Sequence, residues 1–198
     1  MKQLLFIALL IAPIFVSAQY NDDKTKRNKN LVDIEISEVF PVKDNRIFYS
    51  EVVSLTDSVK SEVLFIRAKK SLTEIFKSAK DVIQMEDSNA GIIVAKGFIS
   101  TGHNPYVRFP KVWFKLKIET KDNRYKYTLT DVVYSFNVSV DYINRDYEDP
   151  LEIWATQTNP VKQKVKDAMN KWLKSIDNEF NSTISRLKVD MSTVEEQW

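Results

Sequence analysis

The stretch VWFKLKIE at residues 112–119 decides the fold class, because apolar and polar side chains alternate along its whole length. The apolar set is Val112, Phe114, Leu116 and Ile118, and the intervening set is Trp113, Lys115, Lys117 and Glu119. An alternation with a period of two predicts a β-strand that has one face against a core and the other toward solvent. We therefore expect an antiparallel sheet built outward from this strand.

Further strands are predicted upstream of this stretch. Residues 82–86 and 92–99 are joined by a polar linker that ends in Gly91, which is typical of a hairpin loop. Residues 47–55 are β-branched and aromatic enough to predict the first long strand. Residues 31–42 contain a short alternation that predicts a brief strand before it.

Downstream, Asp122-Asn123 predicts a turn into a strand over residues 124–136. The two adjacent apolar residues Val132-Val133 break its alternation and predict a bulge near Asp131. Residues 137–159 are expected to form a long connection with acidic and aromatic clusters. Connections of this length in compact domains are either functional or poorly ordered.

Two helices are predicted around these strands. The first is expected to begin at a cap formed by Asp57 or Ser58. Its apolar residues recur at three- and four-residue spacing: Leu64, Ala68, Leu72, Ile75 and Phe76. Asn159 as cap and Pro160 at the first position begin the second, whose expected apolar stripe is Val161, Val165, Met169, Trp172, Ile176 and Phe180. The order β-α-β-β-β-β-α predicts an α+β fold of two layers, an antiparallel sheet with both helices on one face.

The N-terminus has the pattern of an export signal. Residues 1–18 combine Lys2, an apolar run over residues 4–16 and small residues at a cleavage position after Ala18. The run is too short to span a bilayer, so a cleaved signal is favoured over an uncleaved anchor, and no transmembrane segment is expected in the mature chain. The protein is therefore expected to be periplasmic or extracellular. A flexible tether over 19–30, one domain over 31–188 and a tail over 189–198 complete the predicted organisation.

Composition excludes several classes of site. The 198 residues include no Cys and one His, which excludes disulfides, iron–sulfur clusters, thiolate zinc sites, Cys nucleophiles and any site with two imidazoles. Three Gly leave no material for a phosphate-binding loop. Loss of Lys2 with the signal lowers the formal net charge from +2 to +1, which does not favour nucleic acid as a partner. We expect no cofactor and no metal.

One run of residues is similar to a known family. It comprises Val52-Val53, Leu64, Arg67-Ala68-Lys69, the stretch from Phe76 through Gln84 and a strand that contains Gly97. Over about residues 47–98 it resembles an uncharacterised, exported bacterial family, a domain of unknown function with a fold like that of the TATA-binding protein (TBP). The resemblance implies a TBP-like fold and an exported setting. It implies no activity, and fold analogy alone does not imply DNA binding.

The candidate ligand-binding residues lie on the expected solvent side of the central strands. Trp113, Lys115, Lys117 and Lys126, with Lys111 beside them, form a basic and aromatic set. Such a face can bind a polyanion or stack on sugars and bases, although lysines there can also simply prevent aggregation of sheet edges. Arg67, at the edge of the first helix, either covers apolar surface or anchors a ligand.

These residues favour a non-enzymatic exported binding module of the cell envelope, whose partner is another envelope protein, a polymer or a small ligand. One alternative is a carbohydrate hydrolase that uses two carboxylates, with Asp146, Glu148 and Asp131 as candidates. Another is a structural component of a surface assembly. The acidic residues after 140 are weak candidates for calcium because they lack regular spacing, and His103 is interpreted as an ordinary loop residue.

Overall fold

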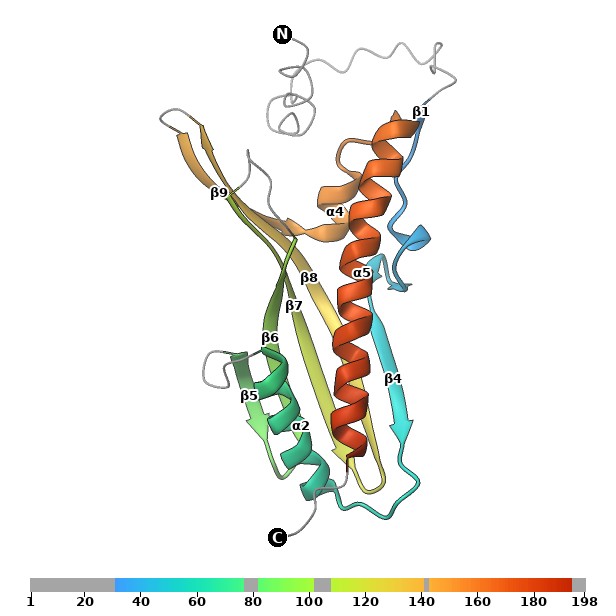
Figure 1. Cartoon of the computed structure of the whole chain (residues 1–198), viewed down its shortest axis with the longest axis vertical. Coiled ribbons are helices and arrows are strands. Elements are labelled where there is room, and N and C mark those ends of the chain that lie inside the picture. The colour runs from blue at the N-terminus through green and yellow to red at the C-terminus, as the bar shows by residue number, and fades with distance from the viewer. Residues whose placement is uncertain (1–30, 77–81, 102–107, 141–142, 194–198) are drawn as a thin grey trace.

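The computed structural model describes residues 31–76, 82–101, 108–140 and 143–193 (Figure 1). Their centre is a six-stranded antiparallel sheet of order β4-β8-β7-β6-β5, with β9 also paired to β8. The strands are β4 (Tyr49–Ser54), β5 (Ile83–Asp87), β6 (Ile92–Ser100), β7 (Arg108–Lys121), β8 (Arg124–Val140) and β9 (Ile143–Pro150). The export signal, the tether and the His103 loop lie outside the described residues.

Two helices, α2 (Ser61–Phe76) and α5 (Gln163–Ser192), pack together on one face of this sheet (Figure 1). The α+β architecture of two layers is therefore confirmed, with β9 added to the predicted order. Among the described residues, no helix is both long enough and apolar enough to cross a membrane.

Short elements complete the fold beside α5. β1 (Leu31–Val32) pairs with β10 (Val161–Lys162), and β2 (Val42–Lys43) pairs with β3 (Arg46–Ile47). A 3-10 turn, η2 (Ile36–Glu38), lies between β1 and β2 in the chain, and a short helix, α4 (Leu151–Thr156), lies between β9 and β10.

The core lies between the sheet and the two helices. The apolar residues of the 112–119 stretch are all at most 1% exposed, as their alternation predicts. Phe180 of α5 is fully buried, and its ring centroid lies 5.1 Å from that of Phe114 and 5.8 Å from that of Tyr49. These aromatic contacts join the helix layer to the middle of the sheet.

The predicted bulge in β8 is present. Asp131 has a φ of 53°, and the β7–β8 register shifts opposite it, between Trp113 and Lys115. The buried side chains of β8 are consequently at odd-numbered positions up to Leu129 and at even-numbered positions from Val132 onward. An extra residue in one strand moves every later side chain to the opposite face. The bulge therefore compensates for the change of phase in the sequence, and the apolar side chains of both halves of this long strand face the core.

The start of α2 differs from the sequence prediction. The N–H of Ser61 donates to the Asp122 carboxylate at 2.9 Å, and the N–H of Val59 donates to the Asn123 side chain at 2.8 Å. The β7–β8 turn therefore supplies the caps that were expected from Asp57 or Ser58. The Ser61 hydrogen bond and Lys60 hold the pKa of Asp122 below its usual value. A cap from a distant turn has no local sequence signal.

Residues 137–159 do not form a long connection, contrary to the sequence prediction. β8 continues to Val140, β9 returns along it, and α4 follows directly. Phe136 and Tyr147 face each other across the hairpin with ring centroids 5.0 Å apart, and Trp154 of α4 packs 4.6 Å from Tyr134. These aromatic pairs stabilise a strand whose other described side chains are mostly polar or charged.

The last helix begins later and ends later than the sequence predicts. Val161 belongs to β10, and the Asn159 amide binds both the N–H and the carbonyl of Ile34 at 2.9 Å instead of capping a helix. Beyond Phe180, the last residue of the predicted stripe, three more buried residues continue it along α5: Ile184, Leu187 and Met191. The predicted boundary of a tail at residue 189 therefore falls inside the helix.

A buried carboxylate holds the N-terminal segment to α4. Glu152 is 8% exposed and accepts a hydrogen bond from the N–H of Ile47 at 2.7 Å, while its second oxygen is buried and lacks a partner among the described residues.

Glu152→Ala is expected to lower the free energy of unfolding by about 1 kcal/mol. That is the low end of the roughly 1–3 kcal/mol cost of an unsatisfied buried group, because the unpartnered oxygen is removed too. Chemical denaturation measures this loss, and Glu35→Ala, at an exposed site, should change stability by less than about 0.5 kcal/mol. Equal values for the two variants would contradict the role of Glu152.

Candidate functional site

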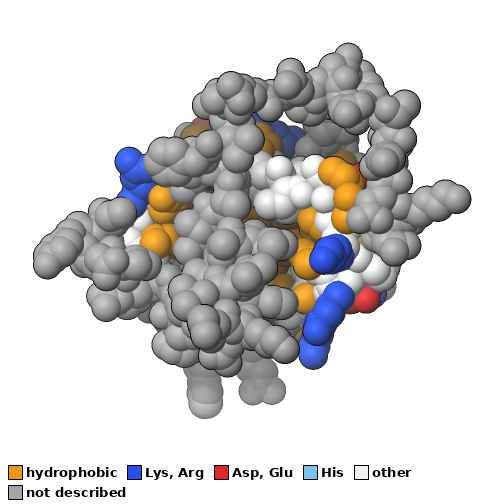
Figure 2. Space-filling model, turned by 90° about the horizontal axis from the view of Figure 1, so that it is seen from above, with side chains coloured by type: hydrophobic (Ala, Val, Ile, Leu, Met, Phe, Trp, Pro, Cys, Tyr) orange, Lys and Arg blue, Asp and Glu red, His pale blue; other side chains and the backbone are white. Residues whose placement is uncertain are grey.

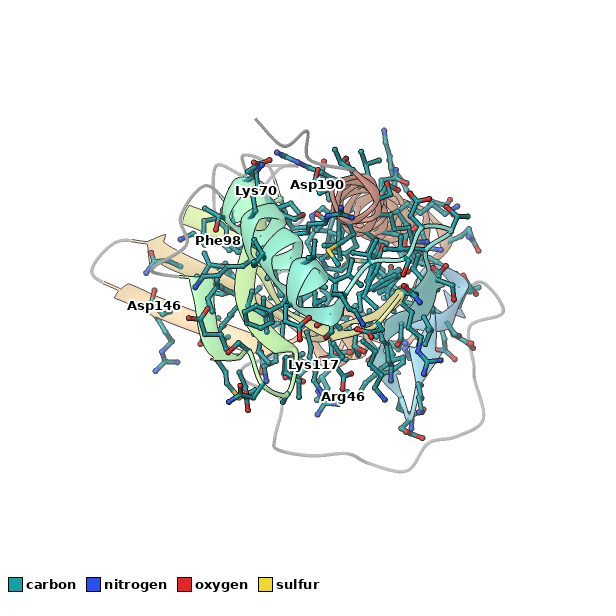
Figure 3. All side chains as sticks on the ribbon, turned by 90° about the horizontal axis from the view of Figure 1, so that it is seen from below. Arg46, Lys70, Phe98, Lys117, Asp146 and Asp190 are labelled. Atoms are coloured by element: carbon teal, nitrogen blue, oxygen red, sulfur yellow. The ribbon has the colours of Figure 1, made fainter. Side chains whose placement is uncertain are left out.

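The face of the sheet opposite α2 and α5, here called the open face, carries the predicted binding residues. Cross-strand pairing places Lys115 opposite Thr130 and Lys117 opposite Thr128. Lys126 lies opposite Glu119, two pairs further along and on the same face. Lys117 points away from the helices in Figure 3. The structure thus brings Trp113, Lys115, Lys117 and Lys126 onto one surface, as the alternation predicts.

Four residues of β6 and β7 form an aromatic–lysine cluster on the open face: Lys96, Phe98, Lys111 and Trp113. The rings of Phe98 and Trp113 have centroids 4.9 Å apart. The Lys111 ammonium lies 4.4 Å from the Phe98 centroid and 5.5 Å from the Trp113 centroid, and the Lys96 ammonium lies 5.1 Å from the latter. These distances allow cation–π attraction. Phe98 remains 44% exposed.

Lys96 and Phe98 are not among the residues that the sequence predicts for this surface. Their strand has apolar residues in both phases, with Ile92 and Val94 on one set of positions and Ile93 and Ala95 on the other. The alternation therefore did not show which set faces solvent. The β6–β7 register, which places Phe98 directly opposite Trp113, decides it.

The positive charge of this surface is only partly neutralised. Lys115 forms an ion pair with Asp131 at 2.6 Å, and Lys117 forms one with Glu119 at 3.0 Å. Within the described parts of the chain, three other lysines of the open face form no ion pair: Lys96, Lys111 and Lys126. The surface therefore offers cations to an anionic partner.

A shallow hollow of about 260 Å³ adjoins the cluster. It is lined by Lys111, Trp113, Ser135, Phe136, Asn137 and Asp146. The Asn137 amide donates to the Asp146 carboxylate across the β8–β9 pair at 2.9 Å. Figure 3 shows Phe98 and Asp146 on the same side of the molecule, at the left of that view. Seen from above in Figure 2, hydrophobic side chains lie beside Lys and Arg side chains on the described part of the surface.

Arg67 lies on the helix side of the molecule, away from these residues. Its guanidinium donates to the carbonyl of Met191 at 3.1 Å, near the end of α5. The last carbonyls of a helix lack intrahelical partners, and a cationic side chain that binds one stabilises the helix end. Nearby, the buried Ser71 hydroxyl donates to Asp190 at 2.6 Å, and Figure 3 shows Lys70 and Asp190 on this side. The contact supports the structural interpretation of Arg67, which lies on another surface than the lysines of the sheet.

The candidate carboxylates of a hydrolase are exposed. Asp146 and Glu148 lie on β9, and Asp131 is paired with Lys115 at the bulge. Only Asp146 lines the hollow. In the part of the chain that the structure describes, no three His, Cys, Asp or Glu side chains lie close enough to hold a metal ion. The geometry therefore does not favour a catalytic pair at these positions.

Several shifted pKa values belong to the helix side of the sheet. The Lys188 ammonium and the Tyr127 hydroxyl bind Glu51 and hold its pKa below the usual value. Burial raises the pKa of Tyr134 to about 12, and burial with the charge of Glu51 raises that of Tyr125 to about 12. The shifts of the two tyrosines reflect packing in the core, whereas that of Glu51 reflects its hydrogen bonds to Lys188 of α5 and to Tyr127.

Comparison with known proteins identifies the fold. Residues 49–135 match a family model described as a domain of unknown function (DUF4468) with TBP-like fold. A TBP-like protein from Parabacteroides distasonis is similar at 18% identity and a TM-score of 0.51, over 75% of this chain and 96% of that one. A DUF4468 family protein from Bacteroides ovatus is similar at 17% identity and a TM-score of 0.55, over 88% of this chain and 99% of that one.

A search of curated proteins found no match. The two solved structures are too distant in sequence to show more than the fold. The family match begins at Tyr49, the first residue of β4, and ends at Ser135 in β8. It therefore spans α2 and most of the sheet, including the aromatic–lysine cluster, and extends beyond the stretch in which the sequence resemblance is found. The chain carries a DUF4468 domain with a TBP-like fold over residues 49–135.

Proposed function

We propose that the protein is a non-enzymatic, exported binding module that holds an anionic polymer of the cell envelope on its open face. The observation that carries this proposal is the aromatic–lysine cluster, which lies on a sheet face that no described helix covers. Cations without ion pairs attract an anionic partner, and exposed aromatic rings provide flat surfaces for stacking. The export pattern of residues 1–18 supports the envelope as the setting.

The shape of the surface favours a polymer over a small ligand. Lys126 and the aromatic–lysine cluster are distributed over three adjacent strands, β6 to β8. Enclosed sites for small molecules have volumes of about 300–1,000 Å³, whereas the hollow beside Trp113 measures about 260 Å³ and lies at the surface. An extended chain contacts several such positions at once.

Binding measurements on three anionic polymers test the proposal: polygalacturonate, polyacrylate and polyphosphate. The double variant Lys96→Ala/Lys111→Ala is expected to lose about tenfold or more in affinity for the best of them, because it removes both cations of the cluster. The affinity of the wild-type protein should fall as salt rises. Trp113→Ala should weaken binding by a similar factor, since a buried aromatic contact often dominates an interface.

Lys171→Ala is the matched control, because this lysine is exposed on α5, away from the open face. It should bind as the wild-type protein does, and circular dichroism should show that every variant is folded. Retained binding by the double variant, or no binding of any of the three polymers at low salt, would contradict the proposal.

A further inference from the structure

The hollow beside the aromatic–lysine cluster contains hydrogen-bonding groups that a simple polyanion does not need. Its lining combines a hydroxyl, an amide and a carboxylate, from Ser135, Asn137 and Asp146. A carboxylate only accepts hydrogen bonds, whereas an amide and a hydroxyl offer both donors and acceptors. This set complements ligand hydroxyl groups, which donate and accept.

The negative charge of Asp146 disfavours a ligand whose polar groups are all anionic. A phosphate or carboxylate seated beside it would meet a like charge. A ligand hydroxyl, in contrast, can donate to its oxygens. The Asn137 hydrogen bond to Asp146, 2.9 Å long, positions the two side chains together.

The aromatic wall and the cation lie next to these polar groups. Lys111 is opposite Ser135 in the β7–β8 register, and Trp113 is two residues further along β7. Neighbouring strands are about 4.7–4.9 Å apart and alternate residues about 7 Å apart. One ring-sized ligand unit can therefore lie against Trp113, reach the polar groups of β8 and β9, and extend an anionic substituent toward Lys111.

We infer that the hollow binds one hydroxylated ring of an acidic polysaccharide, a sugar unit that carries both hydroxyl groups and a carboxylate. This inference rests on the proposed function and specifies the polymer. Trp113 stacks on the face of the ring, Asn137 and Asp146 bind its hydroxyls, and Lys111 with Lys96 binds carboxylates along the chain. Nucleic acid fits less well, because Asp146 would repel its phosphates.

Matched polymers separate the contributions of charge and hydroxyl groups. Polygalacturonate carries both, its methyl ester keeps the rings without the charge, and polyacrylate keeps the charge without the rings. We expect the wild-type protein to bind polygalacturonate at least tenfold more tightly than either of the others. Single-stranded DNA of equal charge should also bind at least tenfold more weakly.

Two acidic variants then test the hollow itself. Asp146→Ala should weaken binding of polygalacturonate about tenfold, and it should leave binding of polyacrylate unchanged or stronger, because a negative charge is lost. Glu148→Ala removes the same charge from the same strand at a residue that does not line the hollow. It should not weaken the binding of polygalacturonate.

Each contrary outcome has a distinct meaning. Equal affinity for polyacrylate and polygalacturonate, tight binding of the DNA, or the same effect of Asp146→Ala on both polymers would overturn the inference and leave the polyanion-binding module intact. Equal binding of the methyl ester would overturn the acidic requirement. If none of the polymers bound, both the inference and the proposed function would fail.

Discussion

Phe180→Ala is expected to lower the free energy of unfolding by about 3–5 kcal/mol, the range for removal of a large aromatic side chain from a core. Phe180 is 0% exposed and lies where α5 meets the sheet. Its ring contacts Phe114, Tyr49 and Phe40, at centroid distances of 5.1, 5.8 and 6.3 Å. These partners come from three separate parts of the chain, so the cavity cannot be closed by one local adjustment.

Urea denaturation followed by circular dichroism measures this loss. Domains are commonly stable by only about 5–15 kcal/mol, so the variant should unfold at a much lower urea concentration. Val189→Ala is the control on the same helix, because Val189 is 63% exposed and should contribute less than about 0.5 kcal/mol. A loss below about 1 kcal/mol for the Phe180 variant would show that this contact does not hold the two layers together.

Gly97→Val is expected to lower the free energy of unfolding by about 3 kcal/mol, at the upper end of the usual cost of overpacking. A Cβ atom at Gly97 would lie 2.0 Å from Cε1 and 2.5 Å from Cδ1 of the Phe76 ring. No side chain tolerates such a separation, so the Phe76 ring has to shift from its place against β6. The missing side chain of Gly97 therefore allows the end of α2 to approach the sheet.

A double-mutant cycle with Phe76→Ala tests this cause. Removing the ring leaves room for the valine, so the double variant should be more stable than the sum of the two single effects predicts, by roughly 0.5–3 kcal/mol. Ser100→Val, at an exposed position of the same strand, should change stability little. Additive effects in the cycle would show that Gly97 is required for another reason.

The architecture was readable in the sequence because local periodicity reports burial. The alternation in residues 112–119 and the helical stripe at Leu64, Ala68 and Leu72 each indicate which side of an element is apolar. An element with one apolar face has few ways to bury it, and a sheet covered by helices on one side is one of them. The bulge at Asp131 was predictable for the same reason, since a change of phase is itself a local pattern.

The errors have a common physical origin in long-range contacts. The segment after residue 136 became β9 because β8 provides a partner strand and aromatic rings to pack against. Asn159 binds the backbone of Ile34, 125 residues away, and Asp122 caps α2 from a turn 61 residues further along the chain. Such contacts leave no periodic signal near the residues that make them.

The candidate site likewise contains residues that the sequence predicts and residues that only the tertiary structure brings together. Alternation alone placed Trp113, Lys115, Lys117 and Lys126 on the solvent side of two strands, because a period of two assigns faces without knowledge of the neighbours. It could not add Phe98 and Lys96, because the side chains of β6 are apolar in both phases, and it could not bring Asp146 to Asn137. The register between strands places these residues side by side, and it depends on strand pairing, turns and packing across the whole sheet.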